Sequence, residues 1–206
     1  MSFEILVWLL PFLVASLVLH ELAHAYVATW LGDPSPRADG RLSFNPIVHL
    51  DPLGTAMFVI TAFVSSFIFG WAKPVMINTR HFRRPQVDMA IVAAAGPATN
   101  LLLALGCVAW IIHGNPEGTL EDVLIRAFEV NVVLGIFNLI PIPPLDGSRI
   151  VGAVLPRALH FRWSQLDQVG ILAIFALIFV FNEQFWDVFS EVLDETTRVM
   201  VTIVTA

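Results

Sequence analysis

The sequence predicts an all-α polytopic membrane protein with four to five transmembrane helices, a re-entrant segment and a small β-sheet at the membrane surface. Of the 206 residues, 57% are hydrophobic and 14% are charged, whereas a soluble globular domain carries about 25% charged residues. Five long apolar stretches follow one another along the chain. The formal net charge of −6 leaves no basic face for a phosphate backbone, which excludes nucleic-acid binding. Cys107 is the single cysteine, so no internal disulfide can form.

Each apolar stretch can be compared with the roughly 20 residues that carry a helix across the hydrocarbon core. The expected spans are about 5–31, 89–112, 127–145 and 166–184, of which the last needs Trp163 and Trp186 at the two interfaces. The first stretch lacks a basic leader and a cleavage site, so we expect a retained helix, kinked at Pro11. These spans form a core over residues 1–184, and the amphipathic tail 185–206 predicts an interfacial helix.

Two short loop segments predict the sheet. Residues 41–44 alternate between polar and apolar side chains within a loop rich in turn formers, and residues 74–78 precede a basic run. Segments of this kind can pair as strands. We therefore expect them to form a small sheet at the membrane surface.

The most informative residues are ionisable groups inside the first apolar stretch, in the run His20-Glu21-Leu22-Ala23-His24. Helix positions i and i+4 share a face, so His20 and His24 can bind one metal ion. Glu21 lies next to that face, in the H-E-x-x-H arrangement of zinc hydrolases. Charged groups at the bilayer centre cost about 2.5 kcal/mol or more, so they are seldom retained without a role.

Two other interpretations of this cluster are possible. The histidines could be core residues bonded to backbone carbonyls, with Glu21 facing an arginine. They could also bind haem, but haem ligands usually approach from opposite sides and Glu21 would have no role. A metal-dependent hydrolase explains all three residues.

A catalytic zinc site uses three protein ligands and an open position. The best third candidate is Asp146, because the apolar stretch before it runs into Pro141, Pro143 and Pro144, which leaves an acid at membrane depth. Taken alone, Asp146-Gly147 is more often a solvated turn. Its combination with an intramembrane His-x-x-x-His pair favours a ligand.

Taken together, these motifs resemble the site-2 protease family of intramembrane zinc metalloproteases, and in particular a compact bacterial branch without a periplasmic peptide-binding or nucleotide-sensing domain. The resemblance rests on five runs, which together cover nearly the whole chain: HELAH at 20–24, NPIVHLDPLGT at 45–55, FGWAKPV at 69–75, AGPATN at 95–100 and NLIPIPPLDG at 138–147.

The resemblance implies one zinc ion per chain, held by His20, His24 and Asp146. Glu21 would be the catalytic acid and base, and Asn138 would assist substrate or oxyanion binding. Asn100 would lie near the site, as a catalytic or a helix-packing amide. His49 is within loop distance of the metal, as an accessory or gating ligand or as an interfacial histidine.

Basic residues predict which way this site faces. The metal-site segments can meet only if 53–71 enters and leaves the membrane on one side, although its 19 uncharged residues are enough to span. Re-entry puts nine Lys and Arg on the site's side and two on the other, whereas a full crossing gives seven and four. The positive-inside rule favours re-entry, with the site near the cytoplasmic face of the cell membrane.

The expected function is regulated intramembrane proteolysis of single-span membrane proteins, with the lipid bilayer as surroundings and a homo-oligomer or a regulatory partner as further possibilities. Two other classes remain open. One is a catalytically inactive scaffold or chaperone that keeps the zinc site. The other is a metal transporter that uses His20, His24 and Asp146 as a transit site.

Overall fold

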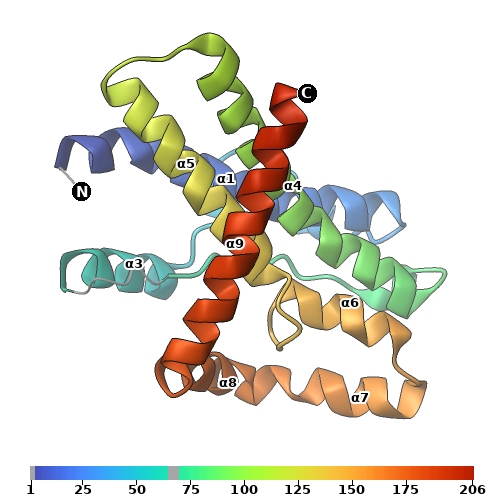
Figure 1. The fold of residues 1–206 in the computed structure, drawn as a ribbon. Coiled ribbons are helices and arrows are strands. Elements are labelled where there is room, and N and C mark those ends of the chain that lie inside the picture. The colour runs from blue at the N-terminus through green and yellow to red at the C-terminus, as the bar shows by residue number, and fades with distance from the viewer. Residues whose placement is uncertain (1–2, 65–69) are drawn as a thin grey trace.

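The computed structural model describes residues 3–64 and 70–206. The described residues form helices joined by loops (Figure 1). The α-helices are α1 (Phe3–Trp30), α2 (Ser35–Ala38), α3 (Pro52–Val64), α4 (Pro85–Gly114), α5 (Thr119–Asn138), α6 (Asp146–Val154), α7 (Arg157–Gln165), α8 (Asp167–Phe179) and α9 (Asn182–Thr205), with the 3-10 helices η1 (Pro46–Val48) and η2 (Thr79–His81).

Helix α4 is the centre of the fold and packs against α1, α5, α6 and α9. Small residues permit this, since Ala93, Gly96 and Ala104 are buried on its faces. On α5, a Cβ added to Gly135 would lie 3.3 Å from the carbonyl oxygen of Pro97. The backbones of α4 and α5 therefore approach closely, as is usual where small residues meet between membrane helices.

The C-terminal helix α9 lies across α4 and α5 (Figure 1). Met200 on α9 joins a buried cluster with Ala104 and Val108 of α4 and Phe128 and Val132 of α5. Val188, Val192 and Ile203 of the same helix stay exposed. Helix α9 thus uses part of its apolar surface to pack on the protein.

The prediction of four to five transmembrane helices is wrong. Among the described residues, two helices are long and apolar enough to span a membrane, Val7–Trp30 within α1 and Pro85–Gly114 (α4). A third span arises there only if α8 and α9, bent by 88°, count as one. The expected span 127–145 fails because α5 ends at Asn138, before the prolines, and begins at Thr119 with Glu121 and Asp122 in its first turn. The expected span 166–184 fails because α8 has only 13 residues.

The predicted surface sheet is also wrong. In the described part of the chain, segments 41–44 and 74–78 form no strand, and an isolated bridge joins Leu50 to Ala72. The two loops are joined through the buried Arg41 guanidinium instead, which donates to Val48 O, Lys73 O and Pro74 O at 2.6, 3.1 and 3.0 Å. Side-chain bonds to the backbone compete with regular pairing in this way.

The segment expected to re-enter the membrane begins with α3. A Cβ added to Gly70 would lie 2.8 Å from Gly54 O, so the chain has returned to the start of α3 by residue 70. Residues 65–69 lie outside the described part of the chain. Re-entry of 53–71 into a bilayer stays a prediction.

Candidate metal centre

Helix α1 presents two imidazoles on one face, as the spacing predicts. His20 and His24 are both buried. His24 Nδ1 lies 2.8 Å from Val92 O, and a carbonyl oxygen can only accept, so Nδ1 carries the proton. His20 Nδ1 donates to Asn100 Oδ1 at 2.5 Å. On both rings Nε2 therefore faces away from Val92 and Asn100, which contact Nδ1.

Asp146 approaches from the turn after α5. The prolines end α5, and Asp146 is the first residue of α6. Gly147 makes the approach possible, since a Cβ there would lie 2.1 Å from Leu139 O. The turn thus places a carboxylate against α1, although 122 residues of chain separate Asp146 from His24.

Three ligand atoms converge at this point. His20 Nε2 and His24 Nε2 are 3.1 Å apart, and each lies 3.3 Å from Asp146 Oδ2. Ligands held about 2.0–2.1 Å from a tetrahedral zinc ion lie about 3.3–3.4 Å from one another. When both rings are neutral, protonation at Nδ1 leaves both Nε2 lone pairs free to bind an ion together with the Asp146 carboxylate. The spacing and the chemistry of the three atoms fit zinc.

Gly96 of α4 leaves room beside these ligands. A Cβ at this position would lie 2.4 Å from His24 Nε2 and 2.6 Å from His20 Nε2. Real Cβ atoms essentially never come so close. Because Gly96 has no side chain, the two imidazoles can sit against α4 at the point where the three ligand atoms meet. This arrangement is also compatible with a bound ion.

Glu21 lies next to the ligand face and is half-buried. Its Oε2 accepts the backbone N–H of Val75 at 3.3 Å. The chain segment 72–78 thus passes directly over the H-E-x-x-H motif. This contact gives the carboxylate a defined position beside the metal ligands.

The remaining predicted site residues lie in different surroundings. Asn100 contacts His20 directly. Asn138 is half-buried and donates to Leu134 O of its own helix at 2.9 Å. His49 is fully buried and its Nε2 donates to Ser43 O at 2.8 Å, while its Nδ1 has no hydrogen-bond partner among the described residues. The structure groups His49 with the loop around Arg41 rather than with His20, His24 and Asp146.

Sequence reasoning did not select Asn131 as a site residue. It is buried in α5 and bonds to Asn100 at 3.0 Å. The available signal was an amide inside an apolar helix, since polar groups at membrane depth are expensive and mark functional sites. That signal cannot tell a packing amide from one that contacts a ligand.

The loops beside the site are tied together through Asp33, which follows α1. Burial would raise the pKa of Asp33, but hydrogen bonds from Ser35 and Asn78 and the charge of His81 outweigh burial and lower that pKa. Asn78 N donates to Asp33 Oδ2 at 2.7 Å. Together with the Glu21–Val75 contact, this bond holds the segment 72–78 along the last turns of α1.

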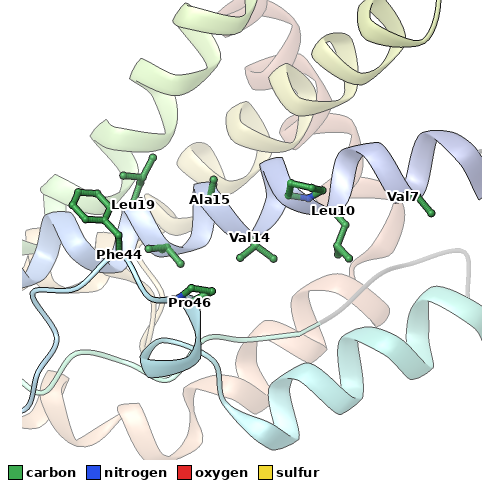
Figure 2. A pocket seen from close by; sticks show the side chains of 9 residues that line it. Val7, Leu10, Val14, Ala15, Leu19, Phe44 and Pro46 are labelled. Carbon is green, nitrogen blue, oxygen red and sulfur yellow. The ribbon is translucent and has the colours of Figure 1, made fainter.

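An apolar groove of about 690 Å³ runs along the other half of α1. Figure 2 shows it between α1, with Val7, Leu10 and Val14, and the loop that carries Phe44 and Pro46. The groove reaches Leu19, the residue before His20. An apolar segment lying in it would end next to the metal ligands.

Two imidazoles and a glutamate on a helix of membrane length, with a carboxylate from the start of α6, are the arrangement expected of the class of membrane metallopeptidases. Comparisons with known proteins agree. The model of the protein family described as "Peptidase family M50" matches residues 114–181 of this chain. The chain is 36% identical over 185 residues to YwhC of Bacillus subtilis, provisionally named a zinc metalloprotease, covering 84% of this chain and 81% of that protein.

Two further relatives carry the same provisional name. Rip2 of Mycolicibacterium smegmatis is 32% identical over 79% of this chain and 63% of its own length. MJ0611 of Methanocaldococcus jannaschii is 28% identical over 73% of both chains. No solved structure gives a significant match. The chain belongs to peptidase family M50, the site-2 protease family.

Proposed function

We propose that the protein is a zinc-dependent endopeptidase that cuts membrane proteins within or next to their transmembrane segments. The convergence of His20, His24 and Asp146 at tetrahedral spacing beside Glu21 carries this proposal. The names of the relatives support zinc as the metal and peptide hydrolysis as the reaction. One zinc ion per chain matches one set of ligands.

Each site residue has a separate role in the proposed hydrolysis. A bound zinc ion would supply Lewis-acid catalysis, acidifying water and polarising a carbonyl oxygen. Glu21 accepts the proton of the attacking water and passes it to the leaving amine, which is general base and then general acid catalysis. The amide of Asn138, on the last turn of α5, donates to the developing oxyanion after leaving its bond to Leu134 O.

Single-span membrane proteins are the proposed substrates, and regulated intramembrane proteolysis is the proposed process. The apolar groove along α1 offers such a segment a path that ends at Leu19. A transmembrane helix hides its carbonyls in its own hydrogen bonds, so the segment to be cut must unwind beside Glu21. A second copy of this chain or a regulatory protein would control when a substrate segment enters the groove and unwinds beside Glu21.

A multi-pass orientation with the site toward the cytoplasmic side completes the proposal. The stretch between the two membrane-length helices, residues 31–84, carries six Lys and Arg, and supports this orientation through the positive-inside rule. Under this orientation both chain ends lie outside the cytoplasm. Cysteine labelling of the loop 115–117 and of the loop 34–40 from either side of intact cells would test it, since the two loops should label from opposite sides.

Glu21→Gln is the variant that tests the function. We would co-express the wild type or the variant with a panel of epitope-tagged single-span membrane proteins and locate cuts by mass spectrometry. Cleavage within or beside a membrane segment should vanish in Glu21→Gln, while zinc content of the purified protein stays unchanged. If the cuts persist in Glu21→Gln, this protein is not the protease that makes them. If the protein transports zinc and Glu21→Gln still does so, the transporter function is favoured.

A further inference from the structure

A chain of buried hydrogen bonds continues from His20 away from the metal site and crosses three helices. Asn100 of α4 accepts from His20 and donates through Nδ2 to Asn131 Oδ1 of α5 at 3.0 Å. Asn131 Nδ2 donates to Ala127 O at 2.8 Å and to Ser16 Oγ of α1 at 2.9 Å. The side chains of Ser16, Asn100 and Asn131 are at most 3% exposed.

The carbonyl of Ala127 sets the direction of this chain. A carbonyl oxygen can only accept, so Asn131 must turn its NH2 group toward Ala127 and its Oδ1 toward Asn100. A reversed Asn131 would place two oxygens in contact. Asn100 must then turn its own NH2 group toward Asn131, which leaves its Oδ1 facing His20.

The direction of the chain selects the tautomer of His20. Because Asn100 Oδ1 faces Nδ1, the neutral ring keeps its proton on Nδ1 and its lone pair on Nε2, the atom that faces His24 and Asp146. His24 reaches the same tautomer directly, through Val92 O. One ligand is thus oriented by the backbone, which no substitution removes, and the other by two side chains.

We infer that Asn131 is a positioning residue of the metal centre. It holds Asn100 in the one orientation that presents an unprotonated Nε2 of His20 to the ion. This inference rests on the proposed function, since zinc is the ion concerned. Groups that orient a ligating histidine typically change metal affinity 10–100-fold when they are removed.

The first test is the zinc affinity of the full-length, detergent-purified protein, measured by competition with a chelator. Asn131→Ala frees Asn100 to turn, so zinc affinity should fall about 10–100-fold. Ser16→Ala is the matched control, because it removes a bond to the same amide but leaves Ala127 to orient it. Its zinc affinity should stay close to that of the wild type, and circular dichroism checks that both variants are folded.

A rescue experiment separates orientation from packing. Asp at position 100 has two equivalent oxygens, so it accepts from His20 Nδ1 whichever way it turns. The double variant Asn100→Asp/Asn131→Ala should therefore regain the zinc affinity that Asn131→Ala loses. A double variant as weak as Asn131→Ala alone would overturn the positioning role.

The tautomer can be measured without zinc. In apoprotein labelled with 15N-histidine, the imidazole nitrogen shifts should show His20 protonated at Nδ1 in the wild type and a tautomer mixture in Asn131→Ala. A folded Asn131→Ala protein with an unchanged tautomer and unchanged zinc affinity would refute the inference. If the wild type binds no zinc, the proposed function fails, while the tautomer measurement still decides whether Asn131 orients the ring.

Discussion

Val75 donates its backbone N–H to Glu21 Oε2 across 3.3 Å, although 54 positions separate the two residues. The bond places the extended segment 72–78 over the carboxylate that we assign as general base. The same segment bonds at its other end to Asp33, through the N–H of Asn78. Glu21 is thus positioned by a loop that is itself anchored at Asp33, just after α1.

Removing this donor should disturb catalysis without disturbing the metal. Val75→Pro has no N–H to donate, so Glu21 loses the bond that orients it. We expect turnover to fall by about tenfold, as for the loss of part of a general-base contribution, while zinc content stays at the wild-type level. Val75→Ala keeps the N–H and is the control. Equal turnover in both variants would show that the bond does not serve catalysis.

The three proposed ligands should be individually required for the metal. Zinc content of the purified wild type should be near one per chain, and His24→Ala or Asp146→Ala should lose most of it, because two ligands rarely hold zinc against competing water. Asp194→Ala removes an exposed carboxylate from α9 as a control. Zinc retained in Asp146→Ala would show that another residue, with His49 the next candidate, completes the site.

Gly96 and Gly106 lie on the same helix and offer a matched pair of substitutions. A Cβ at Gly96 would come within 2.4 Å of His24 Nε2, whereas one at Gly106 would meet nothing within 4 Å. Gly96→Ala should therefore displace the imidazoles and lose zinc, and Gly106→Ala should keep it. The check is zinc content together with the melting temperature of each variant. Normal zinc binding by Gly96→Ala would mean that the ligand atoms do not meet there.

The grouping of His20, His24 and Asp146 could be predicted because the signals are local. Helical periodicity alone puts His20 and His24 on one face, and Pro141 to Pro144 end a helix wherever it packs. The position of Asp146 against α1 then follows from the need for a third ligand, and the structure groups the three residues. Zinc itself stays a prediction until it is measured.

The sheet and the number of spans could not be predicted, since both depend on tertiary contacts. Alternation at 41–44 favours a strand, but the loops meet through the Arg41 side chain, which bonds to the carbonyls of 48, 73 and 74. Hydropathy joins 139–145 to the apolar end of α5, whereas the helix ends at Asn138. Asn131 gave no distinct signal, because only the packing of α5 against α4 shows what its amide contacts.

The loop anchored by Asp33 should loosen in acid. The folded protein lowers the pKa of Asp33 below its usual 3.8, so the folded state favours the carboxylate and the unfolded state binds the proton more readily. The resulting stability is present above pH 3.8 and is lost as the pH falls through the lower, folded value. In Asp33→Asn this contribution is absent at every pH.

Hydrogen exchange and thermal unfolding from pH 7 down to pH 3 can check this effect. Above pH 4 the wild type should be more stable than Asp33→Asn and should protect Asn78 N–H better, because the carboxylate accepts that bond at 2.7 Å. The difference should shrink as the pH falls below 3.8. Asp39→Asn, at an exposed aspartate in the same loop, is the control. A wild-type advantage that did not shrink between pH 4 and pH 3 would mean that packing around Asp33, rather than its charge, ties the segment 72–78 to the end of α1.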